Sequence, residues 1–192
     1  LNSNINKLRI NKFVIGFVGR MLKDKGIEDY FYVLSKCKTN KLPIIGFLVG
    51  PNECEEELFK LIKKYNLTIN KDVFLFGQQI EPQKYMVYFD ILLFPTKREG
   101  FGLVAAEANS LGIPVVGYDI PGLRDAVSNK KTGTLVHFGD RIKLLNAVLS
   151  YYNSPKLKKL HGENGRVRVI KKFEQTAIWE SYHAKYLELS QS

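Results

Sequence analysis

Two glutamates stand eight positions apart in residues 96–116, which have the sequence TKREGFGLVAAEANSLGIPVV. The tripeptide GFG follows Glu99, and a run of small residues surrounds Glu107. On one unbroken helix, eight residues rise by about 12 Å, which is too far for two carboxylates to act on one atom. The spacing therefore favours two contacts at opposite ends of one ligand over a general acid and a general base.

The glycines of the GFG tripeptide predict a break between the two carboxylates, because glycine disfavours helix. We expect a helix to begin near Leu103, which leaves Glu99 in a loop and Glu107 a little over one turn inside the helix. The free amides of Leu103 and Val104 then lie between the carboxylates, at the positive end of the helix dipole. A diphosphate fits these amides, with hydroxyl groups on either side of it. Two ordinary charges near a helix N-terminus are the alternative interpretation.

A second segment, GRMLKDKG, follows an apolar run and includes the cations Arg20 and Lys25. Gly19 permits a tight exit from a strand, and Gly26 can open a helix with free amides. Arg20 and Lys25 lie between these glycines. The combination predicts a phosphate or diphosphate site, and two surface charges are the alternative. No third glycine completes a dinucleotide-binding fingerprint.

Two further loops carry weaker signals. In FLFGQQIEP, Gly77 permits a turn, and exposed backbone beside Gln78 and Ile80 suits a nucleobase. The segment DIPGLRDAV begins a helix with Gly122 near its first amides, which predicts either an anion contact or a plain turn.

Other kinds of active site lack their residues in this sequence. No serine lies in a GxSxG elbow and no paired aspartates suit a metal, so we expect neither a hydrolase nor a metal site. The histidines, His137, His161 and His183, have no partner at ligand or triad spacing. We expect all of them to be structural.

Short apolar runs alternate with longer amphipathic runs, a pattern typical of a parallel sheet covered by helices. Strands are expected at residues 13–18, 44–49, 73–76, 91–94, 115–118 and 133–136, and helices at 27–36, 55–65, 83–89, 103–111 and 124–128. The sequence therefore predicts an α/β fold, a Rossmann-like doubly wound parallel sheet of about six strands. In such sheets ligands bind beyond the carboxyl ends of the strands, where the loops above lie.

Three regions are expected along the chain. Residues 1–12 are a polar lead-in or linker, residues 13–153 form the sheet domain, and residues 154–192 form C-terminal helices. The chain begins without Met, and we expect it to be a piece of a longer protein.

Two helical features stand out in the last third of the chain. Asp140 is expected to cap a helix. Further on, Trp179, Tyr182, Tyr186 and Leu189 recur at helical spacing and make one apolar stripe. This stripe is expected to contact either the core or a neighbouring domain outside this sequence.

The chain carries 29 Lys and Arg against 19 Asp and Glu, a net charge of +10. The excess is concentrated in residues 156–172. A solvated helix face is the simplest interpretation, and attraction to acidic lipid headgroups is the next. Nucleic acid is not expected as a partner, because no stacking aromatic side chains alternate with these charges.

Several features bear on the cell compartment. No apolar run approaches the ~20 residues needed to cross a bilayer, and the first residues lack the apolar core of a signal peptide. Cys37 and Cys54 form no metal or redox motif. We therefore expect a cytoplasmic protein, with peripheral contact to the inner face of the cell membrane as an open alternative.

The order of these segments resembles the C-terminal, donor-binding half of retaining glycosyltransferases of the two-domain GT-B fold, in the broad family 4 group. The resemblance runs from about Phe13 to the C-terminus. It is carried by GRMLKDKG, FLVGP, VFLFG, DILLFPTKREGFGLVAAEANSLGIPVV and TGTLV. The most specific feature is Glu, seven residues and Glu within this order of segments.

The resemblance implies a role for each matching residue. Arg20 and Lys25 match the pair that grips the donor diphosphate and stabilises the departing nucleotide. Glu99 matches the glutamate that contacts the donor sugar, and with the two cations it is expected to be catalytic. Glu107 matches the glutamate that holds the ribose hydroxyls. The other expected donor-binding residues are Gly19, Gly77, Gln78, Ile80, Gly100, Phe101, Gly102, Leu103 and Val104.

The resemblance also implies a UDP- or GDP-sugar as donor, with no cofactor and with cations in place of a metal. Two departures from the family pattern limit what it implies. The sequence PGLRD replaces a segment that often has two glycines and a glutamate, which leaves the role of Asp125 open. The helix expected at residues 83–89 is also shorter than usual, so the choice of base is not predicted.

The implied function is donor binding for a retaining transferase that moves a hexosyl residue to a glycan or polyprenyl-linked acceptor. Bacterial capsule or lipopolysaccharide synthesis is the expected setting. The acceptor site is expected on an N-terminal domain outside this sequence, so this chain alone is expected to be inactive. A nucleotide-sugar epimerase is the rival enzyme, and a non-catalytic module that binds anionic lipid or nucleic acid is the rival class.

Overall fold

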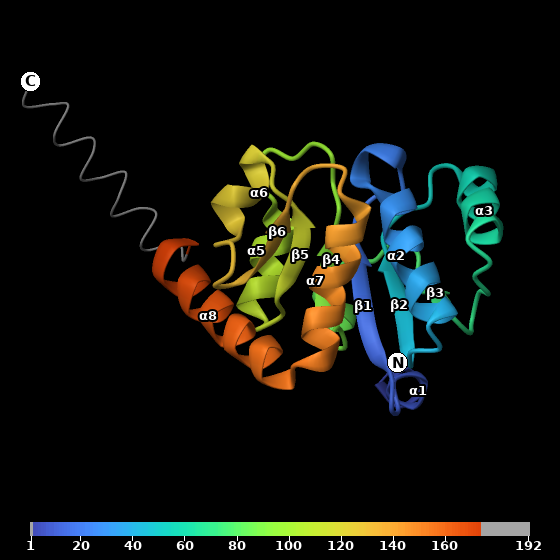
Figure 1. Ribbon diagram of the computed structural model, residues 1–192, viewed down its shortest axis with the longest axis horizontal. Coiled ribbons are helices and arrows are strands. Elements are labelled where there is room, and N and C mark those ends of the chain that lie inside the picture. Colours follow the sequence, from blue (N-terminus) through green and yellow to red (C-terminus); the bar gives the residue numbers. More distant parts are fainter. Residues whose placement is uncertain (1, 174–192) are drawn as a thin grey trace, which may run out of the picture.

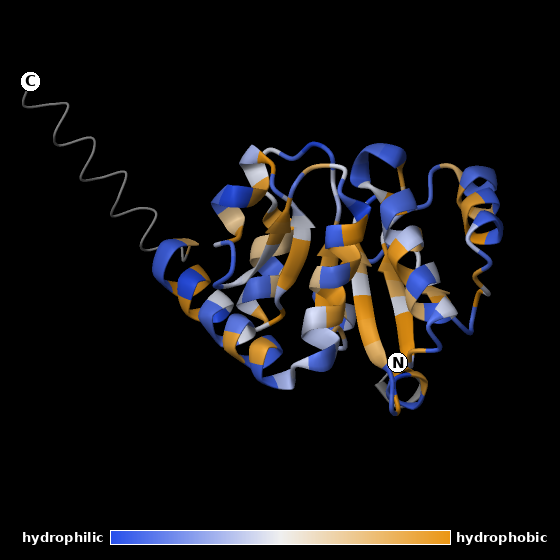
Figure 2. Ribbon diagram, in the orientation of Figure 1, coloured by the Kyte–Doolittle hydropathy of each residue, from blue (hydrophilic) through white to orange (hydrophobic). Residues whose placement is uncertain are grey.

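Six short apolar runs form the strands of one parallel sheet, which lies at the centre of the molecule (Figure 1). The structure is a computed structural model that describes residues 2–173. The strands are β1 (Phe13–Val18), β2 (Ile44–Val49), β3 (Val73–Leu75), β4 (Ile91–Phe94), β5 (Val115–Tyr118) and β6 (Gly133–Val136). Figure 2 shows β1 and β2 as nearly continuous hydrophobic runs. Such runs are expected of parallel strands that are buried on both faces.

The strand order is β3-β2-β1-β4-β5-β6, so the chain reverses its direction of travel between β1 and β4. Ile15 pairs with Gly46 of β2 on one side and with Ile91 of β4 on the other. A crevice at the carboxyl ends of two such strands is where doubly wound sheets bind ligands. These ends lie toward the top of Figure 1.

Helices cover both faces of the sheet. They are α1 (Asn2–Leu8), α2 (Ile27–Thr39), α3 (Glu55–Lys64), α4 (Gln83–Met86), α5 (Leu103–Ser110), α6 (Pro121–Ala126), α7 (Arg141–Asn153) and α8 (Pro155–Phe173), with one short 3-10 turn, η1 (Lys23–Lys25). Helix α2 packs against α7 on one face of the sheet (Figure 1). Helix α5 packs against both α8 and α6. The α/β doubly wound fold is therefore confirmed.

Most expected elements lie close to where the sequence placed them, and the main differences are at the start of the chain and at α6. Residues 1–12, expected as a polar lead-in, contain α1, and Ile5 of this helix is buried. The helix expected at 124–128 begins at Pro121 instead, because proline is well suited to the first helical position. After Ser154 the first of the expected C-terminal helices is present as α8, which ends at Phe173. The Trp179 stripe and His183 lie outside the described residues. No helix in the described part of the chain is long and apolar enough to span a membrane.

A buried carboxylate joins three elements near the carboxyl edge of the sheet. Asp29 of α2 accepts a hydrogen bond from the Tyr118 hydroxyl at 2.8 Å and forms an ion pair with Arg141 at the start of α7. Burial, and then the nearby carboxylate, raises the pKa of Tyr118, so the phenol stays a donor. The expected cap of α7 is confirmed, since the Asp140 side chain accepts from the backbone N–H of Lys143.

Two glycines seat α8 directly on the α5 region. A Cβ added to Gly162 would lie 2.1 Å from the carbonyl oxygen of Gly112, and one added to Gly165 would lie 2.9 Å from the side chain of Asn109. Asn109 is itself buried and donates to the carbonyls of Ile113 and Thr132. Backbone and a fixed amide therefore meet the glycine face of α8, and no flexible side chain lies between them.

This packing predicts that Gly162→Ala destabilises the protein. Alanine gains about 1 kcal/mol of helix propensity, but overpacking against backbone costs up to about 3 kcal/mol, so we expect a net loss of about 1–2 kcal/mol. Urea unfolding followed by circular dichroism measures the change. Gly100→Ala is the matched control, since nothing lies within 4 Å of its added Cβ, and unchanged stability of both variants would contradict the close seating of α8.

Candidate functional site at the carboxyl edge of β1 and β4

The loops that follow β1 and β4 lie against each other. A Cβ added to Gly26 would lie 1.9 Å from the carbonyl oxygen of Pro95, so only glycine fits there. The backbone N–H of Lys97 donates to the carbonyl of Asp24 at 2.8 Å, and the Thr96 hydroxyl lies 3.4 Å from that same oxygen. Two segments that are far apart in the sequence therefore form one surface at the switch point.

An ion pair connects the two loops. The Lys25 Nζ lies 3.0 Å from the Glu99 Oε2, and the two side chains are 19% and 22% exposed. The Lys25 Nζ also lies 3.5 Å from the carbonyl oxygen of Arg98. Partial burial reduces screening by water, so this pair holds its geometry better than a fully exposed pair. The structure thus brings together two of the three residues expected to be catalytic.

Helix α5 begins where the sequence predicted, directly after the GFG tripeptide. Gly102 precedes the helix in a left-handed conformation (φ 76°), which glycine adopts without strain. The amides of Leu103 and Val104 in the first turn have no acceptor within the helix. Gly122 of α6 packs beneath the loop that precedes α5. A Cβ added to Gly122 would lie 2.2 Å from the carbonyl oxygen of Glu99. The positive end of α5 is therefore held next to the Lys25–Glu99 pair.

Glu107 lies one turn inside α5 and is partly buried. Its Oε1 is 3.5 Å from the Nε2 of Gln83, at the start of α4. Burial raises the pKa of the Glu107 carboxyl, and the contact with Gln83 opposes this in part. A carboxylate that loses hydration in this way is a strong acceptor for ligand hydroxyl groups.

Arg20 is placed apart from this pair. One guanidinium nitrogen lies 3.8 Å from the Glu53 carboxylate in the loop after β2, and the Arg20 side chain is half exposed. The described contacts therefore do not join Arg20 to Lys25 or Glu99.

Three glycines tie the loops after β1, β2 and β3 together. A Cβ added to Gly50 would lie 2.1 Å from the carbonyl oxygen of Gly19, and the Gly50 N–H donates to the carbonyl of Gly77 at 2.8 Å. Beyond Gly77, which has a φ of 66°, Gln78 and Ile80 are exposed. The loop expected to face a base therefore lies on the same edge but makes no described contact with Glu99 or Glu107.

The sequence did not single out several residues that shape this site. Gln83 was expected only as the start of a helix, and Glu53, Asp24 and Pro95 were not singled out as site residues. Phe101, expected as a donor residue, contacts the ring of Phe173 at 5.1 Å between centroids. These contacts join segments that are distant in the chain, so no local pattern reports them.

His137 and His161 make no described contact with Lys25, Glu99 or Glu107. His161 is buried, its Nδ1 is 2.7 Å from the Tyr151 hydroxyl, and burial lowers its pKa. The His137 Nδ1 contacts the neighbouring Phe138 carbonyl. Within residues 2–173, no three His, Cys, Asp or Glu side chains are grouped so as to hold a metal ion.

Comparison with known proteins identifies a family that this chain matches. The family model for glycosyl transferases group 1 matches residues 2–168. The capsular polysaccharide biosynthesis glycosyltransferase CapM of Staphylococcus aureus is 35% identical over 190 residues, which are 97% of this chain and 49% of CapM. The UDP-Gal:alpha-D-GlcNAc-diphosphoundecaprenol alpha-1,3-galactosyltransferase of Escherichia coli is 27% identical over 180 residues, which are 90% of this chain and 45% of that enzyme.

A solved structure agrees with these matches. A mutant of S. aureus TarM, crystallised in complex with fondaparinux, alpha-GlcNAc-glycerol and UDP, matches with a TM-score of 0.81 at 27% identity. The match covers 95% of this chain and 36% of TarM, so the chain spans about half or less of the length of these relatives.

The doubly wound sheet, with its loops gathered at the switch point, is the architecture of one domain of a GT-B glycosyltransferase. The chain belongs to the glycosyl transferases group 1 family and corresponds to the C-terminal domain of its members.

The raised pKa of Glu107 predicts that its ionised carboxylate lowers the stability of the fold at neutral pH. A carboxyl whose pKa is higher in the folded state stabilises the fold below the pKa of the unfolded chain, about 4.3, and loses that contribution as the pH rises through the folded value. At pH 7 the wild-type protein therefore carries a desolvated charge that Glu107→Gln lacks. We expect the variant to melt at a higher temperature at pH 7, with the difference shrinking toward pH 4.

Thermal melts across this pH range measure the effect. Glu163→Gln on the exposed surface of α8 is the matched control, because it makes the same change in net charge. A melting temperature of Glu107→Gln that follows the control at every pH would contradict the burial effect.

Proposed function

We propose that this chain binds the nucleotide diphospho-sugar donor of a retaining glycosyltransferase. The observation that carries the proposal is the Lys25–Glu99 ion pair at the switch point, beside the first amides of α5. A diphosphate requires positive charge and N–H donors together, and both are held there by close backbone contacts. Hydroxyl groups on either side of it would meet Glu99 and Glu107.

The proposed mechanism depends on charge placement. When the sugar leaves its nucleotide, negative charge builds on the diphosphate, and preorganised cations stabilise that charge. Lys25 and the amides of Leu103 and Val104 are placed for this work, and Arg20 reaches the same edge from the end of β1. In this proposal the two cations do what a metal ion does in other transferases. Glu99 would contact the sugar near its reacting carbon.

The relatives support a more specific donor and acceptor. The TarM complex contains UDP, and the E. coli relative is named for UDP-Gal and a diphosphoundecaprenol acceptor. We therefore propose a UDP-hexose as donor and a glycan or polyprenyl-linked sugar as acceptor. CapM and the E. coli enzyme also favour bacterial capsule or other surface polysaccharide synthesis as the setting. Because the chain covers about half of these relatives, transfer itself is proposed only for a longer protein.

Calorimetric titration tests donor binding by the 192-residue chain. We expect UDP and at least one UDP-sugar to bind with a Kd between micromolar and millimolar, and GDP-sugars to bind more weakly. The absence of heat from every UDP and GDP compound at millimolar ligand would overturn the donor site.

Two substitutions test which residues carry the affinity. Lys25→Ala removes a charged contact to the diphosphate, and Glu107→Gln removes a charged acceptor for the ribose, so each should weaken UDP binding at least about tenfold. Lys36→Ala and Glu163→Gln are the controls, since both residues are exposed on other helices. Equal affinity of all four variants would contradict the assigned roles.

A further inference from the structure

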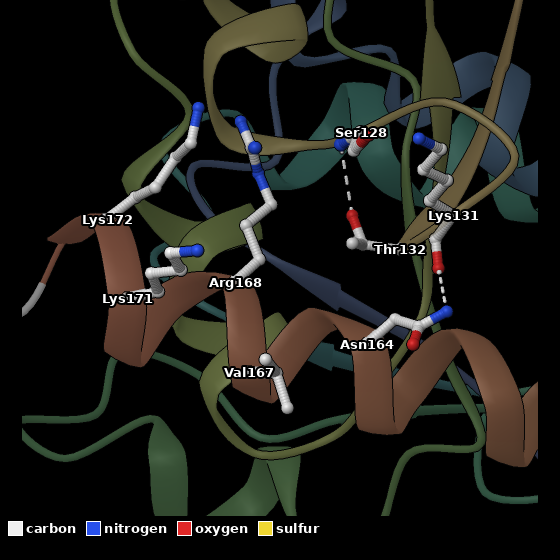
Figure 3. A pocket seen from close by; sticks show the side chains of 8 residues that line it. All are labelled: Ser128, Lys131, Thr132, Asn164, Val167, Arg168, Lys171 and Lys172. Carbon is white, nitrogen blue, oxygen red and sulfur yellow. Dashed lines mark hydrogen bonds between the residues drawn. The ribbon is translucent and has the colours of Figure 1, made fainter.

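A pocket of about 540 Å³ lies between α8 and the segment that leads into β6. It contains none of the residues proposed for donor binding. Its lining residues are Ser128, Lys131, Thr132, Asn164, Val167, Arg168, Lys171 and Lys172 (Figure 3). Half of these side chains are cations and none is an acid, which is unusual on a protein surface that mixes both signs. We refer to it as the basic pocket.

Within the part of the chain that the structure describes, the cations of the basic pocket form no ion pair with a carboxylate. Many other cations in the described residues form ion pairs, such as Lys23 with Glu57 at 2.6 Å and Lys38 with Asp72 at 2.7 Å. Within residues 2–173, no ion pair involves Lys131, Lys171 or Lys172, which are exposed. Four positive charges that line one pocket repel one another, and an anion bound between them would relieve that repulsion.

Arg168 is fixed at the wall of this pocket. One of its terminal nitrogens donates to the carbonyl of Asp125 at 2.9 Å. Its Nε is shielded from water and has no hydrogen-bond partner within the described residues. Figure 3 shows that Arg168 and Lys172 extend side by side from α8, away from the helix axis and toward the segment that carries Ser128. A guanidinium held in place in this way adds a fixed positive charge to the wall of the pocket, and such a charge suits a phosphate group.

The opposite wall is also held in place. The Ser128 N–H donates to the Thr132 hydroxyl at 3.0 Å, and the Asn164 amide donates to the Lys131 carbonyl at 3.1 Å. These bonds tie the segment before β6 to itself and to α8, as Figure 3 shows. Lys131 therefore belongs to a segment that is hydrogen-bonded to α8.

We propose that the basic pocket binds a phosphate group. Its charge, its hydroxyl and amide donors and its volume suit a phosphate ester or a diphosphate. It has no aromatic side chain on which a base could stack, so it does not suit a nucleic-acid strand. The proposal is independent of the donor site.

The phosphate can come from a lipid headgroup or from a soluble ester. On the same helix, Leu160, Val167 and Ile170 are 49%, 64% and 59% exposed, and Val167 lines the pocket itself. Exposed apolar side chains beside unpaired cations are the composition of a surface that meets an anionic membrane. A soluble ester would not require these apolar side chains.

Two binding measurements with the 192-residue chain separate these sources. One is calorimetric titration with inorganic pyrophosphate, and the other is co-sedimentation with vesicles of phosphatidylcholine, with or without an equal part of phosphatidylglycerol. The test variant replaces Lys131, Lys171 and Lys172 with Ser. All three residues are exposed, so its melting temperature should stay close to that of the wild type. The control variant replaces Lys12, Lys63 and Lys71 with Ser, which removes the same charge from exposed positions elsewhere.

We expect the test variant to bind at least about tenfold more weakly than the wild type, and the control variant to stay within about twofold. Binding to anionic vesicles alone would identify a lipid headgroup, and binding to pyrophosphate that survives Lys25→Ala would identify a soluble phosphate. An equal loss in the test and control variants would mean that net charge alone attracts the anion, and would overturn the proposal. Wild-type protein that binds neither probe, or binds only pyrophosphate through Lys25, would overturn it as well.

Discussion

The backbone of Gly26 lies against the carbonyl of Pro95, and the arrangement of the loops at the carboxyl edge of β1 and β4 depends on this contact. It lets the loop after β1 touch the loop after β4 without an intervening side chain. The hydrogen bond from Lys97 N–H to the Asp24 carbonyl then fixes their relative position. A side chain at residue 26 would push the loops apart, and the two charges they carry would no longer meet.

Two carboxylates and a cation lie at this edge of the sheet. Glu99 pairs with Lys25 in the loops before α5, and Glu107 lies one turn inside α5. The partial burial of Glu107 opposes its ionisation, which costs folding free energy. The apolar sheet, whose strands β1 and β2 are buried at every position, offsets such local costs.

Local patterns predicted the strands well, because most of the apolar runs end at a glycine, a proline or a charge. They also predicted the start of α5, because Gly102 permits the left-handed turn that precedes it. They did not predict the Lys25–Glu99 contact, which joins residues 74 positions apart and depends on the strand order. The excess of cations in α8 was visible in the sequence, but the basic pocket also depends on Lys131 from another element. Hydrophobic periodicity contains no information on which distant segments become neighbours.

The glycine face of α8 has a mechanical consequence. Gly162 and Gly165 rest on the backbone at Gly112 and on the fixed side chain of Asn109, with no compressible side chain between them. We therefore expect the two helices to move together. A displacement of α8 would then shift α5, and with it the amides of Leu103 and Val104. Any element that pulls on the end of α8 near Phe173 would act at a distance on the N–H groups proposed to hold the diphosphate.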